Sequence, residues 1–320
     1  MNNKNVLVLG SEGYLGSILI PNLIKQKKIN LFGVDNCTFG FYNKFKNFNF
    51  RKSNICDLSN KYLDKATIII DLANISNDPA SELNPKFTKI NNYDYKKKII
   101  NQIKKSKNFE KYIYISSCSV YGFNKKKVSE RDITKPISLY SKFCKKTEDY
   151  LKEKLKKKFV IFRLGTLYGW SPRMRYDIAI NKLIRDGYFL KKIEINGGSQ
   201  YRFFCYNKLA SDAILDAIDN KSLIGQIFNL GNVNFNLNNL TKKIVKKINV
   251  KKLQVIKDQF NVDKRSYKVS STKFEKMTHR KNKYLNFEKT IMETFKKIKN
   301  DKKPFDEKKV TLNLYNKLLK

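Results

Sequence analysis

Three glycines near the start of the chain are the first residues whose spacing suggests chemistry. They form GxxGxxG, Gly10-Ser11-Glu12-Gly13-Tyr14-Leu15-Gly16, directly after the apolar run Val6–Leu9. Glycine permits a tight turn, close approach of the backbone to a phosphate and close packing of the following helix. The start of that helix adds N–H groups and the positive end of its dipole. The pattern predicts a dinucleotide pyrophosphate site, with an ordinary glycine-rich turn as the alternative.

Two carboxylates follow the glycine loop. Asp35 comes about 20 residues after the loop, at the end of a second apolar run. A carboxylate there can accept hydrogen bonds from both hydroxyls of an adenosine ribose and would repel a 2′-phosphate, so NAD is favoured over NADP. Asn36 is expected in the same contact. Asp57 is a candidate for contacting the adenine amino group, and capping of a helix before Leu58 is an equal alternative.

The elements that must position these residues alternate along the first half of the chain. Short apolar runs predict strands and amphipathic runs predict helices. The predicted strands are 6–9, 30–34, 67–72, 112–116 and 159–163, and the predicted helices include 14–24 and 141–156. This alternation indicates an α/β fold with a doubly wound parallel sheet covered on both faces.

The pattern is looser after about residue 165. Residues 165–175 and 196–206 are predicted to be loops, 227–230 a strand and 240–248 a helix. We therefore expect a dinucleotide-binding domain over 1–165 and a smaller lobe over 166–300, with some segments returning to the first sheet. Residues 301–320 are expected to form a charged tail, either a peripheral helix or partly disordered.

Composition excludes several classes of protein. The 320 residues carry a net charge of +39, but Lys is spread along the whole chain, so a coding bias is favoured over nucleic-acid binding. The five cysteines are widely spaced and there is one histidine, so neither a metal site nor a disulfide scaffold is expected. No apolar run is long enough for membrane insertion or export, and a cytoplasmic location is expected.

Several further segments, taken together with the glycine loop, resemble the extended short-chain dehydrogenase/reductases, particularly the NAD-dependent epimerase/dehydratase group. The matching segments are Asp71-Leu72-Ala73, Asn91, Ser116-Ser117-Cys118-Ser119-Val120-Tyr121-Gly122, Pro136-Ile137-Ser138-Leu139-Tyr140, Arg163-Leu164-Gly165-Thr166-Leu167-Tyr168-Gly169 and Ile227-Phe228-Asn229-Leu230-Gly231. The resemblance covers about residues 5–295 and implies a Rossmann domain with a nucleotide-sugar lobe.

The resemblance also implies roles for individual residues. Leu72, Ala73 and Asn91 would contact the cofactor, and Ser117 and Tyr140 would be catalytic. A Tyr140 phenolate can take the proton of a sugar hydroxyl while the sugar carbon gives hydride to nicotinamide, with Ser117 holding the same oxygen. Without the resemblance, Ser117 would be a turn-capping serine and Tyr140 an ordinary aromatic at a helix start.

One position departs from the family motif YxxxK. The lysine position, four residues after Tyr140, is Cys144, and Lys145 follows it. In a helix, residues i and i+4 share a face, whereas i+5 is turned about 100° further. Three interpretations stay open: Lys145 substitutes by reaching around, the charge of the cofactor alone tunes Tyr140, or the chemistry is weak or altered.

The residues after Ser117 limit which reactions of the family are expected. The family's dehydratases and decarboxylases carry carboxylates there, whereas this chain has Cys118 and Ser119. Water elimination needs a positioned acid and base, so dehydration is disfavoured. An epimerase needs only Tyr, Ser and NAD. A reductase with Cys118 as acid/base is conceivable, although Asp35 argues against NADPH.

Substrate contacts are expected in the second half of the chain. Thr166 follows a strand at a position where relatives often bind substrate, and arginines lie in segments that bind nucleotide diphosphate in relatives. The candidates are Arg173, Arg175, Arg202 and Arg265, of which Arg202 is the best match, with a surface charge as the alternative for each. Relatives dimerise through helices near 92–105 and 141–156, and the Lys density there would weaken a homodimer.

The sequence therefore favours an NAD-dependent nucleotide-sugar epimerase that oxidises a sugar carbinol transiently, an isomerase rather than a lyase or an oxidoreductase. Two alternatives stay open on the same fold. One is an NAD(P)-dependent dehydrogenase or reductase, which would release NADH. The other is a non-catalytic NAD- or nucleotide-sugar-binding protein, which Cys144 suggests.

Overall fold

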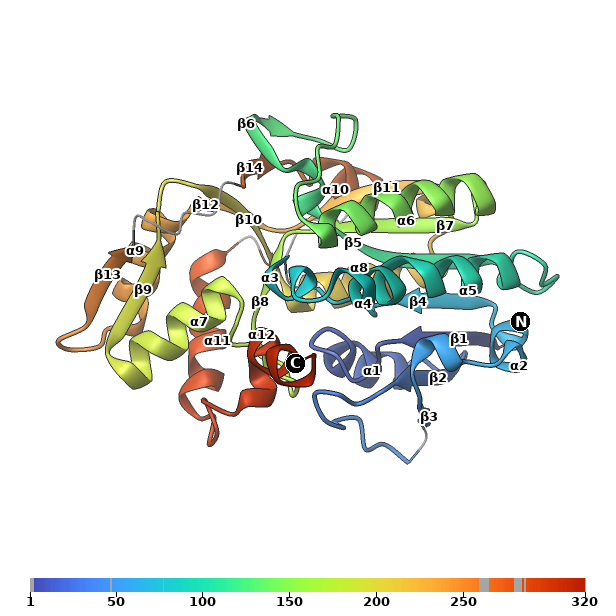
Figure 1. The fold of residues 1–320 in the computed structure, drawn as a ribbon, viewed down its shortest axis with the longest axis horizontal. Coiled ribbons are helices and arrows are strands. Elements are labelled where there is room, and N and C mark those ends of the chain that lie inside the picture. Colours follow the sequence, from blue (N-terminus) through green and yellow to red (C-terminus); the bar gives the residue numbers. More distant parts are fainter. Residues whose placement is uncertain are drawn as a thin grey trace.

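The computed structural model describes residues 3–46, 48–76, 78–258, 265–278, 284 and 286–319; the single histidine, His279, lies outside them. A seven-stranded sheet runs through its centre in the order β11-β7-β5-β4-β1-β2-β3 (Figure 1). The strands are β1 (Lys4–Leu9), β2 (Ile29–Asp35), β3 (Asn49–Lys52), β4 (Ile68–Asp71), β5 (Lys111–Ser117), β7 (Phe159–Leu164) and β11 (Gln226–Leu230). Every pair in this sheet is parallel. The strand order reverses between β1 and β4, so a crevice is expected at the carboxyl ends of these two strands.

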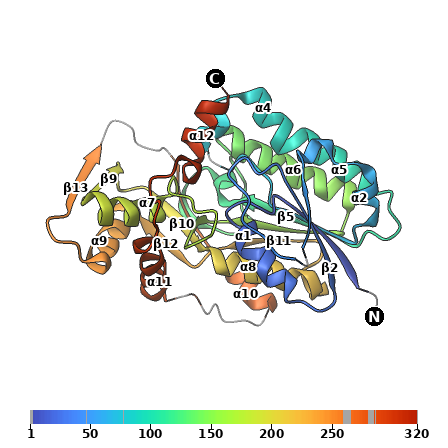
Figure 2. The same cartoon turned by 90° about the horizontal axis from the view of Figure 1, so that it is seen from below.

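Helices cover both faces of this sheet (Figure 2). One face carries α1 (Gly16–Ile24), α8 (Asn207–Asp219) and α10 (Thr272–Thr278), and the other carries α2 (Asn60–Lys65), α5 (Tyr95–Ile103) and α6 (Leu139–Leu155). Because both faces are covered, every residue of β4 and β7 is buried, which explains their unbroken apolar runs. The predicted α/β class and parallel sheet are confirmed.

A smaller lobe packs beside the carboxyl ends of the sheet. Its strands are β8 (Thr166–Tyr168), β9 (Lys192–Asn196), β10 (Tyr201–Tyr206), β12 (Val233–Asn236) and β13 (Gln254–Asp258), and its helices are α7 (Ala179–Arg185), α9 (Leu237–Ile248) and α11 (Phe287–Lys299). Two further strands, β6 (Phe123–Val128) and β14 (Ser266–Val269), pair with each other. Within the described ranges, every helix is too short or too polar to cross a lipid bilayer.

The two segments predicted to be loops each contain a strand, so that prediction was wrong. β8 lies within 165–175 and β10 within 196–206, and the two pair in parallel from Thr166 opposite Phe204. The apolar run of β10 is interrupted by Arg202, whose side chain is nevertheless buried, and β8 has only three residues. Neither strand therefore had a clear periodic signal.

Short helices complete the fold around the crevice. They are α3 (Asp78–Glu82), α4 (Pro85–Lys89) and α12 (Thr311–Leu318). α12 belongs to the segment expected as a peripheral or disordered tail, yet it packs against α3, and the backbone N–H of Tyr176 in the lobe donates to the Lys309 carbonyl at 2.7 Å. The segment therefore bridges the two parts of the molecule.

Candidate active site

A cavity of about 1320 Å³ opens at the carboxyl ends of β1 and β4, where the strand order predicts a crevice. Its walls come from the glycine loop, the ends of β4 and β5, the start of α6, the lobe and α12. Sites for single drug-sized ligands measure about 300–1,000 Å³. The cavity therefore has room for a dinucleotide together with a second nucleotide.

The glycine loop forms one end of this cavity. Gly10 has φ +81°, and a Cβ there would lie 3.0 Å from the backbone nitrogen of Ala73. A Cβ on Gly16 would lie 2.4 Å from the Ser11 carbonyl oxygen, so this glycine lets α1 start directly against the loop. No side chain of the described residues caps the start of α1. Its N–H groups and dipole are therefore directed to the cavity, as a phosphate site requires.

Asp35 lies beside the loop, as predicted, at the end of β2. Its carboxylate accepts from the backbone N–H of Glu12 at 3.0 Å and of Cys37 at 2.8 Å. Burial raises the pKa of Asp35, although these two hydrogen bonds act in the opposite direction. Glu12, itself buried, accepts from the N–H groups of Tyr42 and Asn43 and so holds the following loop. Two acidic side chains at this point favour an unphosphorylated ribose.

The other predicted cofactor contacts are mostly brought to the cavity. Its lining includes Gly13, Tyr14, Leu15, Asn36, Leu72, Ala73 and Asn91. Asp57 is exposed and accepts from Asn54 at 3.2 Å, and Asn54 and Ile55 line the cavity in its place. Tyr14 donates to the Gly169 carbonyl at 2.5 Å, which ties the glycine loop to the lobe.

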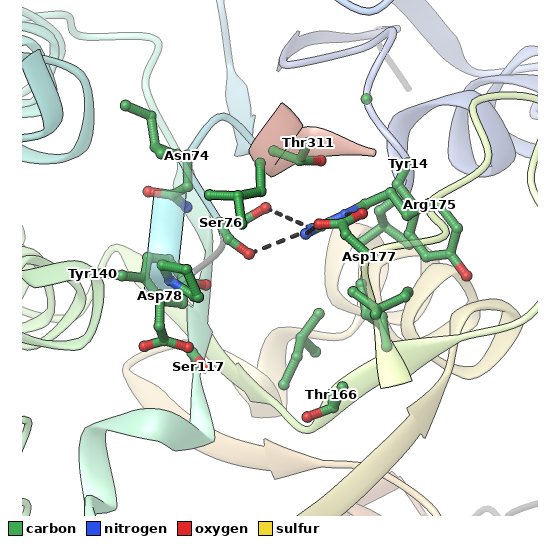
Figure 3. A pocket seen from close by; sticks show the side chains of 18 of the residues that line it. Tyr14, Asn74, Ser76, Asp78, Ser117, Tyr140, Thr166, Arg175, Asp177 and Thr311 are labelled. Carbon is green, nitrogen blue, oxygen red and sulfur yellow. Dashed lines mark hydrogen bonds and ion pairs between the residues drawn. The ribbon is translucent and has the colours of Figure 1, made fainter. Parts of the chain in front are cut away.

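Tyr140 and Ser117 lie on one wall of the cavity, next to Asp78 (Figure 3). Ser117 ends β5, and Tyr140 is in the first turn of α6, which Ser138 caps by accepting from the Ser141 N–H at 3.2 Å. The Tyr140 N–H donates to the Ser81 hydroxyl of α3 at 3.2 Å. Burial raises the pKa of the Tyr140 phenol well above its usual value, while a hydrogen bond from Ser117 acts in the opposite direction.

Cys144 lies one helical turn after Tyr140 on the buried face of α6. Burial raises the pKa of its thiol to about 12, so it is neutral at physiological pH. Lys145 is turned away from the cavity lining and pairs with Asp149 at 2.5 Å. The structure therefore does not bring Lys145 to Tyr140, and no lysine of the described residues occupies the motif position.

A different lysine is buried nearby. The Lys96 ammonium of α5 lies 2.6 Å from an Asp71 oxygen at the end of β4 and 2.7 Å from the Ala73 carbonyl, and both side chains of the ion pair are fully buried. The Tyr112 hydroxyl donates to the same Asp71 oxygen at 2.7 Å, and Lys96 stands 5.2 Å from the centre of the Tyr114 ring. The sequence does not reveal this cluster, because the lysine run 96–98 in an amphipathic helix is expected to face solvent.

The predicted substrate residues divide into two groups. Thr166, Arg175, Arg202 and Arg265 line the lobe side. Arg175 pairs with Asp177 at 2.5 Å. Its guanidinium also donates to the Ser76 hydroxyl, on the facing side of the cavity, at 3.0 Å (Figure 3). Arg265 pairs with Asp78, and Arg202 donates to the Tyr201 carbonyl at 2.9 Å. Arg173 instead lies on the cofactor side, where its backbone N–H donates to Ser17 of α1 at 3.4 Å.

Cysteine 118 is not placed for proton transfer. The Cys118 thiol is buried and donates to the Arg163 carbonyl at 3.1 Å, and burial raises its pKa well above the usual value. Ser119 lines the cavity but donates its hydroxyl to Ser117 at 2.9 Å. The acidic side chain of Asp78 lies on this wall, and it is held by Arg265 and Ser138.

The strand order, the glycine loop and the Tyr140–Ser117 pair define a dinucleotide-binding α/β protein of the Rossmann type. A smaller lobe lines the same cavity. The family comparison agrees: the model of the NAD dependent epimerase/dehydratase family matches residues 6–231, and this chain belongs to that family.

Individual relatives are similar over most of their length. An "uncharacterized UDP-glucose epimerase", YtcB, from Bacillus subtilis is 31% identical over 247 residues, which cover 71% of this chain and 76% of that protein. A UDP-N-acetylglucosamine 4-epimerase from Methanobrevibacter ruminantium, solved with UDP-N-acetylmuramic acid, has a TM-score of 0.82 at 25% identity and covers 92% of this chain and 98% of that one. A UDP-glucuronic acid 4-epimerase from Bacillus cereus, solved with UDP-glucuronic acid and NAD, has the same fold at 22% identity, with a TM-score of 0.79 over 92% and 99% of the two chains.

Proposed function

We propose that this protein is an NAD-dependent nucleotide-sugar epimerase that oxidises and re-reduces one carbinol of the sugar. The observation that carries the proposal is the placement of Tyr140 and Ser117 on one wall of a cavity that also contains the glycine loop. The similar solved structures include UDP-sugar 4-epimerases, which supports a nucleoside-diphosphate sugar as substrate.

The residues present fit NAD. Gly10 and Gly16 let the loop pack directly against the Ala73 and Ser11 backbone, which leaves the uncapped start of α1 at the cavity for a pyrophosphate, and Asp35 stands where the adenosine ribose hydroxyls would lie. NAD, when bound, supplies the hydride acceptor and donor. Leu72 and Ala73 at the end of β4 would contact the same ligand.

The chain's own residues handle the proton. Tyr140 would accept the proton of the sugar hydroxyl at its phenolate oxygen and return it when the carbinol re-forms. Ser117 would donate to the same sugar oxygen and hold it at Tyr140. Because the neutral thiol of Cys144 replaces a motif cation, the Tyr140 phenolate has no lysine ammonium of α6 beside it. We expect a slower proton transfer at neutral pH than a lysine at this position would give.

Epimerisation is favoured over dehydration by the wall around Ser117. Elimination of water needs a further acid and base next to the sugar. The two residues after Ser117 are a buried thiol bonded to a carbonyl and a serine, and neither can act as a carboxylate does. Asp78 is held in two contacts of its own.

Two other functions are supported by particular observations. The neutral Cys144 supports a non-catalytic protein that binds NAD or a nucleotide sugar. The same cavity also suits a dehydrogenase or reductase, in which NADH would leave after each turnover. Net NADH release and sugar isomerisation separate these functions.

The test is to identify dinucleotide bound to the purified protein by mass spectrometry and to incubate it with UDP-, GDP- and dTDP-sugars, following the products by chromatography. An isomerised sugar without net NADH is expected, and Tyr140→Phe should lower the rate by about 10²–10⁴-fold. Tyr150→Phe on the same helix is the control, since its hydroxyl bonds Asn101 at 2.8 Å outside the cavity lining. A product that has lost water would favour a dehydratase, and bound NAD without turnover would favour the binding protein.

A further inference from the structure

Arg173 is a buried cation that forms no ion pair with a carboxylate of the described residues. Its side chain is 2% exposed, and its Nε and Nη1 have no hydrogen-bond partner among the described residues. The guanidinium lies 3.9 Å from the centre of the Phe39 ring, and Nη2 donates to the Thr311 hydroxyl at 3.0 Å. Burial, together with the neighbouring charge of Arg175, lowers the pKa of Arg173 to about 10, which leaves it charged at neutral pH. Unpaired buried donors on a cation are costly unless a ligand completes them.

The surroundings of Arg173 belong to the cofactor end of the cavity. The backbone N–H of Arg173 donates to Ser17, one residue after Gly16 at the start of α1. Phe39 follows Asp35 in the loop after β2 and lines the same cavity. Arg173 and the start of α1 therefore present N–H donors from two sides to the same space. A ligand that uses both must carry several acceptor oxygens, as the pyrophosphate of a dinucleotide does.

The segment 301–319 closes this space from outside. Thr311 holds Arg173, and Tyr315 packs edge-on against Phe39 with ring centres 5.5 Å apart and against Phe87 of α4 at 6.3 Å. Tyr176 of the lobe anchors the segment, because its N–H donates to the Lys309 carbonyl and its hydroxyl donates to Asp301 at 2.7 Å, while Lys309 and Asp301 pair with each other inside the segment. Residues 310–313 and Tyr315 line the cavity (Figure 1 shows α12 between the two parts of the molecule).

We propose that Arg173 and the segment 301–319 form a clasp on the dinucleotide, in which the guanidinium of Arg173 binds the pyrophosphate and α12 covers it. The inference rests on the NAD binding of the proposed function and adds to it. The ligand supplies the acceptors that Nε and Nη1 lack, so the cation, Thr311 and α12 are ordered together with the cofactor. Release of NAD then requires α12 to leave Phe39 and Phe87, and the cofactor is retained between turnovers.

The test uses the full chain freed of dinucleotide and measures NAD affinity, NAD dissociation rate and amide hydrogen exchange. Arg173→Met should weaken NAD binding by about ten- to a hundredfold, as expected for loss of charge-assisted hydrogen bonds. It should leave the NAD-free protein as stable as the parent or more stable, because an unpaired buried cation is removed. Tyr315→Ala should speed NAD dissociation by about tenfold. NAD should slow exchange in residues 311–318 of the parent.

The control is Lys317→Ala on the same helix, since Lys317 is exposed and pairs with Glu307 at the surface. It should leave all three measurements unchanged. Unchanged NAD affinity in Arg173→Met, or faster exchange of α12 when NAD binds, overturns the clasp. NAD binding that depends on Arg173 in a protein that epimerises no sugar contradicts the proposed function alone. A parent chain that binds no NAD contradicts both.

Discussion

Lys96 and Arg173 are both buried beside the cavity, and among the described residues they differ in what neutralises their charge. Lys96 lies against Asp71, the Ala73 carbonyl and an aromatic ring, so its charge is satisfied inside the protein. Arg173 has a hydroxyl and a ring but no carboxylate partner. A buried charge is stable when it is paired. We infer from this comparison that the Lys96–Asp71 pair stabilises the fold, whereas Arg173 binds an anionic ligand, as proposed above for the pyrophosphate.

The same difference bears on the acidity of Tyr140. The Lys96 ammonium acts electrostatically on the Cys144 thiol, and it is already paired with Asp71. Lys96 is therefore not free to stabilise a phenolate at Tyr140 as a lysine at the motif position would. The cavity therefore offers a buried cation for the cofactor at Arg173, but among the described residues it offers no free lysine ammonium for proton transfer at Tyr140.

The largest effect is expected from breaking the Lys96 pair. Lys96→Met leaves the Asp71 carboxylate buried with two neutral donors, the Tyr112 hydroxyl and the Ala73 N–H, and removing one partner of a buried ion pair costs about 3–5 kcal/mol. Urea unfolding of the parent and the variant measures this loss. Adding Asp71→Asn to Lys96→Met should recover most of it, because no unpaired charge remains. A loss below about 1 kcal/mol would show that the pair is not ionised.

The next largest change in the free energy of unfolding is expected when the motif lysine is restored at position 144. Cys144→Lys forces a long side chain into a filled space beside Lys96, and overpacking costs about 1–3 kcal/mol. Combined with Lys96→Met, the introduced ammonium can pair with Asp71, so the double variant should unfold at a higher urea concentration than Lys96→Met alone. Equal stability of Cys144→Lys and the parent would mean that the two positions do not share this space.

The pH dependence should separate the two regions. Burial raises the pKa of Tyr140, so the phenolate is scarce at neutral pH and its population grows about tenfold per pH unit below that pKa. The epimerisation rate should therefore rise between about pH 7 and 9. NAD affinity should stay level over the same range, because Arg173 keeps its proton to about pH 10. A rate that is flat in pH while NAD affinity changes would reverse this assignment.

The smallest effect is expected from the hydrogen bond that the Thr311 hydroxyl accepts from Arg173. Thr311→Val keeps the shape of the side chain and removes an acceptor at 3.0 Å, a change worth about 0.5–1.5 kcal/mol. NAD binding by titration calorimetry should weaken a few-fold. Thr272→Val, on an exposed helix start away from the cavity lining, serves as the reference. A loss as large as that of Arg173→Met would place Thr311 in direct contact with the cofactor.

Much of the cofactor end could be predicted from the sequence because its requirements are local. The turn at Gly10, the contact at Gly16 and the strand end at Asp35 each depend on a few consecutive residues. Apolar runs likewise located six of the seven strands of the main sheet, whereas the mostly exposed edge strand β3 was not predicted. What could not be predicted depends on contacts between distant residues. Lys96 meets Asp71 across 25 positions, and Arg173 meets Thr311 across 138. No local pattern marks either pair, nor the strands β8 and β10, whose burial comes from their neighbours.

The Asp71–Lys96 pair has a consequence for how the sequence can change. Cys144 and Lys96 are both fully buried and interact electrostatically, so we expect a lysine at 144 and a lysine at 96 to compete for the Asp71 carboxylate. A single substitution at either position passes through a less stable protein. Among related chains we therefore expect the two positions to vary together, with lysine at one of them and a smaller or uncharged residue at the other.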